Sequence, residues 1–254
     1  MTPPLPRVTT DDFDAVLFDL DGVLTSTARV HSVCWKKMFD EFLERRAADT
    51  GGTFVPFDMD SDYKRYVDGK PRYDGVRSFL ESRGIELPYG DPGDAPGTLT
   101  ACGLGNRKDR LFNEVLKEEG VEAYEGTIRW ARELRGRGLK TAVVSSSKNC
   151  RNIMEAAGIE ELFDARMDGE IAQRLGIPGK PAPDTYLRAA EELGVGPERA
   201  VVVEDALSGV EAGRRGGFGL VIGVDRHGDA DALRENGADV VVTDLAEMLE
   251  QGPA

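Results

Sequence analysis

The sequence is poor in the residues that build metal clusters and covalent frameworks. Its 254 residues include only three cysteines and two histidines, and the cysteines stand far apart without a CxxC pair. A disulfide framework and a zinc site are therefore not expected, and the sparse cysteines favour a reducing cytosol. No run approaches the roughly 20 apolar residues that span a bilayer, and residues 1–12 lack the apolar core of a signal peptide. We expect a cytoplasmic protein without membrane contact.

Positive charge is also scarce. Lys and Arg number 32 against 46 Asp and Glu, which gives a formal net charge of −14. This balance argues against non-specific binding to nucleic acid or to anionic lipid. A small anionic substrate remains compatible, because a local basic pocket can lie within an acidic protein.

Apolar patterning divides the chain into two kinds of structure. Beyond about residue 125, helical patterns alternate with Val-rich strands, which is typical of a parallel sheet covered on both faces. A strand at 14–20 belongs to the same sheet. We therefore predict an α/β fold, a doubly wound parallel sheet with a Rossmann-like core and an inserted α-helical domain. The expected parts are an N-terminal tail over 1–12, a core domain over 13–27 and 125–254, and a helical cap domain over 28–124.

The expected insertion contains two segments that do not read as helices. These loops, at 49–60 and 84–105, are rich in Gly and Pro, and a loop as long as the second is typical of a lid, a binding loop or disorder. The helices predicted around them are 27–48, 61–68, 73–82 and 106–119.

The most informative motif is the run Asp19-Leu20-Asp21-Gly22-Val23-Leu24-Thr25, which directly follows a strand-like segment. Alternate residues of an extended strand share a face, so Asp19 and Asp21 can address one ligand at the carboxyl end of the sheet. Paired carboxylates suit Mg²⁺ and phosphate, since one can attack phosphorus while the other moves a proton. Such a pair in isolation is more often a solvated turn.

Three further polar groups fall at predicted strand ends or before a helix. They are Ser145-Ser146-Ser147-Lys148-Asn149, Lys180 within Gly-Lys-Pro-Ala-Pro-Asp, and Glu204-Asp205 after Val201-Val202-Val203. Each alone has an ordinary explanation as a helix cap, a surface residue or a turn. Together they supply hydroxyl and backbone N–H donors, a fixed cation and further acids for a metal. This set favours phosphoryl transfer, which depends on positioning and charge neutralisation.

Taken in order, DLDGVLT, VVSSSKN, GKPAPD and VVVEDALSG resemble the four motifs of the haloacid dehalogenase (HAD) superfamily, over about residues 14–249. The resemblance implies that Asp19 is the nucleophile that forms an aspartyl-phosphate and that Asp21 is the general acid and base. The implied phosphate-binding residues are Ser145, Ser146 and Lys180. The implied Mg²⁺ ligands are Asp19, Asp21, Glu204 and Asp205.

The start of the insertion, Thr25-Ser26-Thr27-Ala28-Arg29-Val30-His31-Ser32-Val33-Cys34-Trp35, resembles the β-phosphoglucomutase family of that superfamily. The resemblance implies that His31 contacts the sugar and couples closure of the cap to protonation of Asp21. Segments around Arg72 and Lys108 are also similar. The residues so implied for the sugar and a second, distal phosphate are His31, Trp35, Gly69, Arg72, Lys108, Ser147, Lys148 and Asn149, with Thr27 in support.

We therefore expect a monomeric, Mg²⁺-dependent phosphomutase of a small phosphorylated sugar. It would interconvert β-glucose 1-phosphate and glucose 6-phosphate through an aspartyl-phosphate and a bisphosphate. One alternative is a sugar-phosphate phosphatase with the same core. Another is a non-catalytic phosphosugar-binding protein, against which the intact Asp19, Asp21, Lys180 and Asp205 argue. His227, in a Gly-flanked loop, reads as structural.

Overall fold

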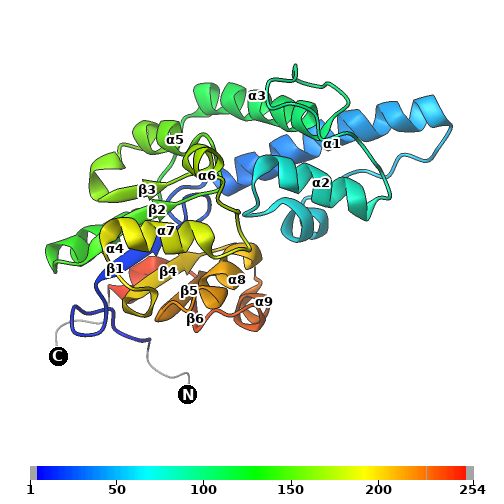
Figure 1. Cartoon of the computed structure of the whole chain (residues 1–254). Coiled ribbons are helices and arrows are strands. Elements are labelled where there is room, and N and C mark those ends of the chain that lie inside the picture. Colours follow the sequence, from blue (N-terminus) through cyan, green and yellow to red (C-terminus); the bar gives the residue numbers. More distant parts are fainter. Residues whose placement is uncertain (1–4, 227, 250–254) are drawn as a thin grey trace. The chain divides into compact units, whose positions relative to one another are not determined.

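The structure is a computed structural model that describes residues 5–226 and 228–249. The chain forms two compact units (Figure 1). The core unit consists of Met1–Ser26 with Val121–Ala254, and the helical unit consists of Thr27–Gly120. Among the described residues, no helix has the length and apolar character needed to cross a membrane.

A six-stranded parallel sheet in the order β3-β2-β1-β4-β5-β6 forms the centre of the core unit. Its strands are β1 (Ala15–Phe18), β2 (Lys140–Val144), β3 (Ala165–Met167), β4 (Ala200–Glu204), β5 (Leu220–Val224) and β6 (Val240–Val242). In this order β1 lies between β2 and β4, and Leu17 is opposite Ala142 and Val202. The chain reverses its winding direction at β1, and such a switch point is where open α/β sheets bind ligands. The predicted fold class is confirmed.

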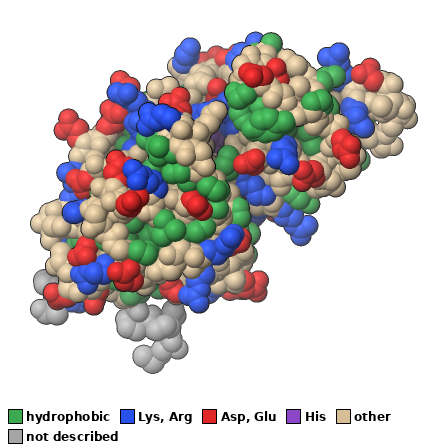
Figure 2. Space-filling model, viewed as in Figure 1, with side chains coloured by type: hydrophobic (Ala, Val, Ile, Leu, Met, Phe, Trp, Pro, Cys, Tyr) green, Lys and Arg blue, Asp and Glu red, His purple; other side chains and the backbone are tan. Residues whose placement is uncertain are grey.

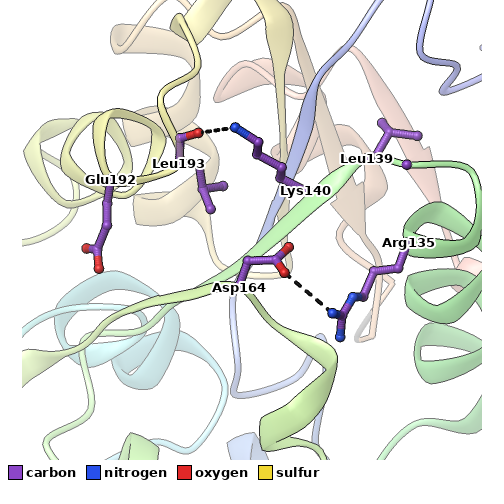
Figure 3. A pocket seen from close by; sticks show the side chains of 7 residues that line it. Arg135, Leu139, Lys140, Asp164, Glu192 and Leu193 are labelled. Atoms are coloured by element: carbon purple, nitrogen blue, oxygen red, sulfur yellow. Dashed lines mark hydrogen bonds and ion pairs between the residues drawn. The ribbon is translucent and has the colours of Figure 1, made fainter.

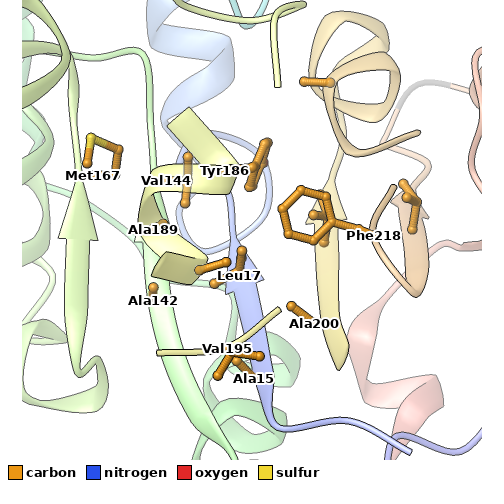
Figure 4. Packing of buried hydrophobic residues seen from close by; sticks show 14 of the residues in the cluster. Ala15, Leu17, Ala142, Val144, Met167, Tyr186, Ala189, Val195, Ala200 and Phe218 are labelled. Carbon is orange, nitrogen blue, oxygen red and sulfur yellow. The ribbon is translucent and has the colours of Figure 1, made fainter. Parts of the chain in front are cut away.

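Helices cover both faces of this sheet because β1 is apolar on both of its faces. Leu17 lies in one buried cluster with Tyr186 and Phe218 (Figure 4). The next residue, Phe18, faces the other way and packs edge-on against Trp130, with ring centroids 5.6 Å apart. The core helices are α4 (Glu125–Gly136), α5 (Cys150–Ala156), α6 (Gly169–Leu175), α7 (Asp184–Leu193), α8 (Leu207–Arg215) and α9 (Ala230–Glu235), with 3₁₀ turns at Glu160–Leu162, Pro197–Arg199 and Leu245–Met248.

The helical unit packs around an aromatic centre. Its elements are α1 (Thr27–Thr50), the π-helix η1 (Tyr63–Val67), α2 (Arg72–Ser82) and α3 (Ala101–Glu119). The Phe39 ring of α1 lies 5.4 Å from that of Trp35, 5.2 Å from that of Phe57 and 4.1 Å from that of Phe79. The segment predicted as a helix over 61–68 thus contains a π-helix, a form that is often found beside functional sites.

The loop predicted over 84–105 is wrong at its end, because α3 begins at Ala101 and not near residue 106. The side chain of Thr100 caps this helix by accepting a hydrogen bond from the Gly103 amide. The glycines at the start of α3 suggested a loop, but they lie within the helix and allow neighbouring groups to pack closely against it. A Cβ on Gly103 would approach a backbone oxygen to 2.4 Å, and one on Gly105 would approach the Tyr73 ring to 2.8 Å.

The prediction also missed α6, whose start is capped by Asp168 through hydrogen bonds from two following amides. Part of the segment expected as a tail is attached to the core unit: Val8 is buried, and Arg199 donates to the carbonyls of Thr10 and Asp11. His227 lies outside the described residues. On the visible surface, acidic and basic side chains are interspersed (Figure 2).

Candidate active site

β1 ends in a tight turn that carries the two aspartates of the first motif. The Asp19 amide donates to Val203 O at 2.9 Å, and the Gly22 amide donates to Thr25 O at 2.7 Å. Gly22 has a φ of 94°, which favours glycine, and a Cβ there would lie 1.8 Å from Oδ2 of Asp205. Both the turn and the adjacent carboxylate therefore require this glycine.

Lys180 connects the first motif to the last. It is 2% exposed, and its Nζ donates to Oδ1 of Asp19 and to Oε1 of Glu204, each at 2.5 Å. Nζ also donates to Val144 O at 3.1 Å. The turn after β1, strands β2 and β4 and the loop before α7 thus meet at one cation. Sequence analysis placed these groups at strand ends, and the structure brings them into contact.

The ionisation of this cluster reflects its burial. Burial raises the pKa of Asp19 well above its ordinary value, Glu204 and Asp21 raise it further, and Lys180 opposes them. Burial alone would lower the pKa of Lys180, but the charges of Asp19 and Glu204 outweigh it and the pKa is raised. The carboxylates therefore keep Lys180 charged, while burial and their mutual repulsion favour the protonated form of Asp19.

Tyr186 and Gly209 support Glu204, and sequence analysis missed both. The Tyr186 hydroxyl is fully buried and donates to Oε1 of Glu204 at 2.9 Å. A Cβ on Gly209 would lie 1.7 Å from the same oxygen, so only glycine fits there. The available signal was spacing alone, since Tyr186 follows Lys180 by six residues within an ordinary helical pattern.

The donor set fits Mg²⁺. Asp19, Glu204 and Asp205 each place a carboxylate oxygen within 4.8 Å of the others, and oxygen donors suit a hard cation. Oε1 of Glu204 already accepts from Lys180 and Tyr186, and its Oε2 accepts from the amides of Asp205 and Ala206 at 3.1 Å. The geometry therefore favours Asp19 and Asp205 as direct ligands and Glu204 as the residue that orients Lys180.

The serine-rich segment after β2 is folded by its own side chains. Ser145 is buried, and its Oγ accepts from the Ser147 amide at 3.1 Å, while the Ser147 Oγ accepts from the Asn149 amide at 3.1 Å. Gly169 packs against this segment so closely that a Cβ would lie 2.5 Å from Ser146 O. The loop is thus held in one shape at the same edge of the sheet as Asp19.

In the helical unit, the structure brings His31, Trp35 and Lys108 together. Lys108 is 5% exposed, its Nζ contacts Nδ1 of His31, and it lies 5.2 Å from the Trp35 ring centroid. The His31 ring stacks on Phe112 at 4.1 Å between centroids. Trp35 also packs in the aromatic centre, as an ordinary core residue would.

Arg72 belongs to a second group in the helical unit. As the first residue of α2, it pairs with Asp109 of α3, with Nη2 and Oδ1 2.6 Å apart. Gly69 precedes it in a turn with a φ of 67°, and Thr27 is buried at the start of α1. The sequence resemblance named Arg72 but did not indicate its carboxylate partner.

A cavity of about 460 Å³ lies elsewhere, at the amino end of β2 (Figure 3). Its two cations already have partners: Lys140 donates to Leu193 O at 2.5 Å, and Arg135 pairs with Asp164 at 3.4 Å. It has neither the paired aspartates nor the buried lysine of the site at the opposite end of the sheet.

Known proteins with similar sequences include phosphate-transferring enzymes, in agreement with the chemistry that this site favours. The haloacid dehalogenase-like hydrolase family matches residues 13–217. A β-phosphoglucomutase from Mycobacterium bovis is 52% identical over 238 residues, covering 92% of this chain and 91% of the relative. A phosphorylated carbohydrates phosphatase from Thermotoga maritima is 31% identical over 90% of this chain and 94% of its own.

Among solved structures, a β-phosphoglucomutase from Clostridium difficile superposes with a TM-score of 0.73. At 22% identity over 93% of each chain, this likeness concerns the fold alone. The matched family region contains all four motifs of the site, so the sequence, the fold and the site support the same family. The chain belongs to the haloacid dehalogenase-like hydrolase family.

Proposed function

We propose that the protein is a β-phosphoglucomutase that interconverts β-glucose 1-phosphate and glucose 6-phosphate. The observation that carries this proposal is a second set of shielded cations, separate from Lys180. The Arg72 side chain is 13% exposed and would hold the second phosphate, and Lys108 is 5% exposed and would contact the sugar. A mutase must bind both phosphates of a bisphosphate, whereas a phosphatase needs only one phosphate-binding site. The 52% identical relative named β-phosphoglucomutase supports the same function.

In the proposed mechanism, a carboxylate oxygen of Asp19 attacks phosphorus and the bond from phosphorus to the sugar oxygen breaks. Asp21 gives its proton to the departing oxygen and later removes one from the hydroxyl that receives the phosphoryl group. Lys180 holds Asp19 and balances charge on the phosphoryl oxygens, with donors from the Ser145 segment. Bound Mg²⁺ would supply further charge neutralisation at the same oxygens.

The helical unit would bind the sugar and the distal phosphate. We assign His31, Trp35 and Lys108 to the sugar. Arg72 and the Ser147-Lys148-Asn149 segment are assigned to the distal phosphate, for which a guanidinium offers paired donors. These roles, the cap function of the helical unit, the monomeric state and the cytoplasmic location are predictions.

The test supplies β- or α-glucose 1-phosphate with Mg²⁺ and a trace of glucose 1,6-bisphosphate, and measures both glucose 6-phosphate and inorganic phosphate. We expect glucose 6-phosphate from the β anomer, little product from the α anomer, and no activity after chelation with EDTA. Release of inorganic phosphate as the main product would contradict the proposal and support a sugar-phosphate phosphatase. That alternative has one specific observation in its favour, the similarity to the carbohydrate phosphatase of Thermotoga maritima.

A further inference from the structure

Arg226, just beyond β5, holds the turn that carries the first motif. Its Nε donates to Gly22 O at 2.8 Å, and its Nη1 donates to Thr243 O at 3.1 Å. The guanidinium lies against the Tyr124 ring, with Cζ 3.7 Å from the ring centroid. One planar cation therefore contacts three other segments of the core unit, and its two hydrogen bonds fix the orientation of the guanidinium.

Arg226 has no acidic partner among the residues that the structure describes. Within residues 5–226 and 228–249, it forms no ion pair, and its Nη2 is buried without a hydrogen-bond partner. Burial raises the pKa of the Tyr124 hydroxyl, Arg226 opposes this, and Asp205 adds to it. The arginine and Asp205 thus act on the same hydroxyl.

Gly22 is confined from two sides. Arg226 holds its carbonyl, and the Asp205 carboxylate fills the space where a Cβ would lie. Gly22 adjoins Asp21 and lies three residues after Asp19, so its position sets how the aspartate turn faces Asp205. Without the Arg226 contact, the turn could move away from Asp205 and the carboxylates would lose their mutual spacing.

We propose that Arg226 is a positioning residue that holds the Asp19–Asp21 turn against Asp205 and thereby sets the affinity of the site for a divalent cation. The inference rests on the proposed metal site and is independent of whether the reaction is mutase or phosphatase. Residues that orient metal ligands without touching the metal change affinity by about 10–100-fold when removed.

The test is calorimetric titration of Mg²⁺ alone into the full-length protein and into three variants. Arg226→Ala should weaken Mg²⁺ binding by about tenfold. Arg226→Lys keeps the charge but loses the planar fork, so it should bind more tightly than Arg226→Ala and more weakly than wild type. If Arg226→Ala does not fold, as judged by circular dichroism, the lysine variant decides the question.

Arg199→Ala is the matched control. Arg199 also donates to two backbone carbonyls, but it does so at the amino end of β1, where it pairs with Asp14. It should lower the thermal stability and leave Mg²⁺ affinity at the wild-type value. Wild-type affinity in both Arg226 variants, or an equal loss in Arg199→Ala, would overturn the inference while the metal site stands. Absence of Mg²⁺ binding by the wild-type protein would overturn the proposed metal site as well.

Discussion

The Nζ of Lys180 lies 2.5 Å from Oδ1 of Asp19, and both side chains are buried in the core unit. This contact joins residues that are 161 positions apart in the sequence. The same ammonium also binds Glu204, so the orientation of the proposed nucleophile depends on a residue that need not touch the substrate. Changes at Asp19, Lys180 and Glu204 should therefore be strongly non-additive.

Asp19→Asn should abolish turnover and leave the fold intact. An amide has nearly the shape of the carboxylate but is not a nucleophile, so no phosphoryl-enzyme can form. The measurement is steady-state turnover of β-glucose 1-phosphate, with circular dichroism as the control for folding. Residual phosphoryl transfer above about one thousandth of the wild-type rate would remove Asp19 from the nucleophile role.

The pH dependence of the activity should reflect the ionisation of the buried carboxylates. Asp19 must be ionised to attack, and burial raises its pKa above 3.8, so activity should fall as the pH decreases through that raised pKa. Glu204→Gln removes a neighbouring negative charge that raises this pKa. The acidic limb of kcat/KM should therefore move to lower pH, while the maximal rate falls because Lys180 loses a negatively charged partner.

The profiles are measured between about pH 4 and pH 8 at one fixed Mg²⁺ concentration for every variant, because bound Mg²⁺ itself favours the ionised form of Asp19. Asp14→Asn is the control, because Asp14 is bound to Arg199 at the other end of β1 and its loss should not move the limb. An acidic limb that stays in place in Glu204→Gln would show that Glu204 does not act on Asp19.

The sequence predicted that the motif residues come together because the motifs follow short apolar strands. An apolar run such as Val201-Val202-Val203 is typical of a strand buried in a parallel sheet. Glu204 and Asp205 directly follow this run, so they lie at the carboxyl end of the strand. The order of the strands brings those ends together. The fold class and the convergence of Asp19, Lys180 and Glu204 were therefore predictable.

Contacts that depend on tertiary packing were not predictable. Tyr186 looks like any apolar helix residue until its hydroxyl is seen on Glu204, and Arg226 looks like a surface charge in a polar loop. The glycines at the start of α3 suggested a loop, although they permit close packing against neighbouring backbone and Tyr73. The intrinsic helix and loop propensities of residues do not reveal contacts with residues that are distant in the sequence.

Arg72→Ala should reduce mutase turnover far more than hydrolysis of a small aryl phosphate. The aryl ester carries no second phosphate, so its hydrolysis does not depend on the residues assigned to the distal phosphate. We expect a loss of more than about tenfold on the sugar phosphate and less than about threefold on the aryl ester. The matched control is Arg107→Ala, which breaks the paired contact of Arg107 with Glu41 in the same unit. Equal losses on both substrates would favour the phosphatase alternative.

His31→Ala should change the fate of the phosphoryl group more than the rate of its transfer to Asp19. Lys108 contacts Nδ1 of His31, so a protonated Lys108 donates to that nitrogen and places the ring proton on Nε2. His31 would then act as a hydrogen-bond donor that recognises a ligand. If closure of the cap depends on it, its loss should admit water to the aspartyl-phosphate.

The experiment measures glucose 6-phosphate and inorganic phosphate from the same reaction in wild type and in His31→Ala. The ratio of phosphate released to glucose 6-phosphate formed should rise, because water then competes with the sugar for the phosphoryl group. Lys37→Ala, an exposed change on the same helix, is the control and should leave the ratio unchanged. A ratio that stays at the wild-type value in His31→Ala would mean that His31 only packs on Phe112, as its stacked geometry alone would allow.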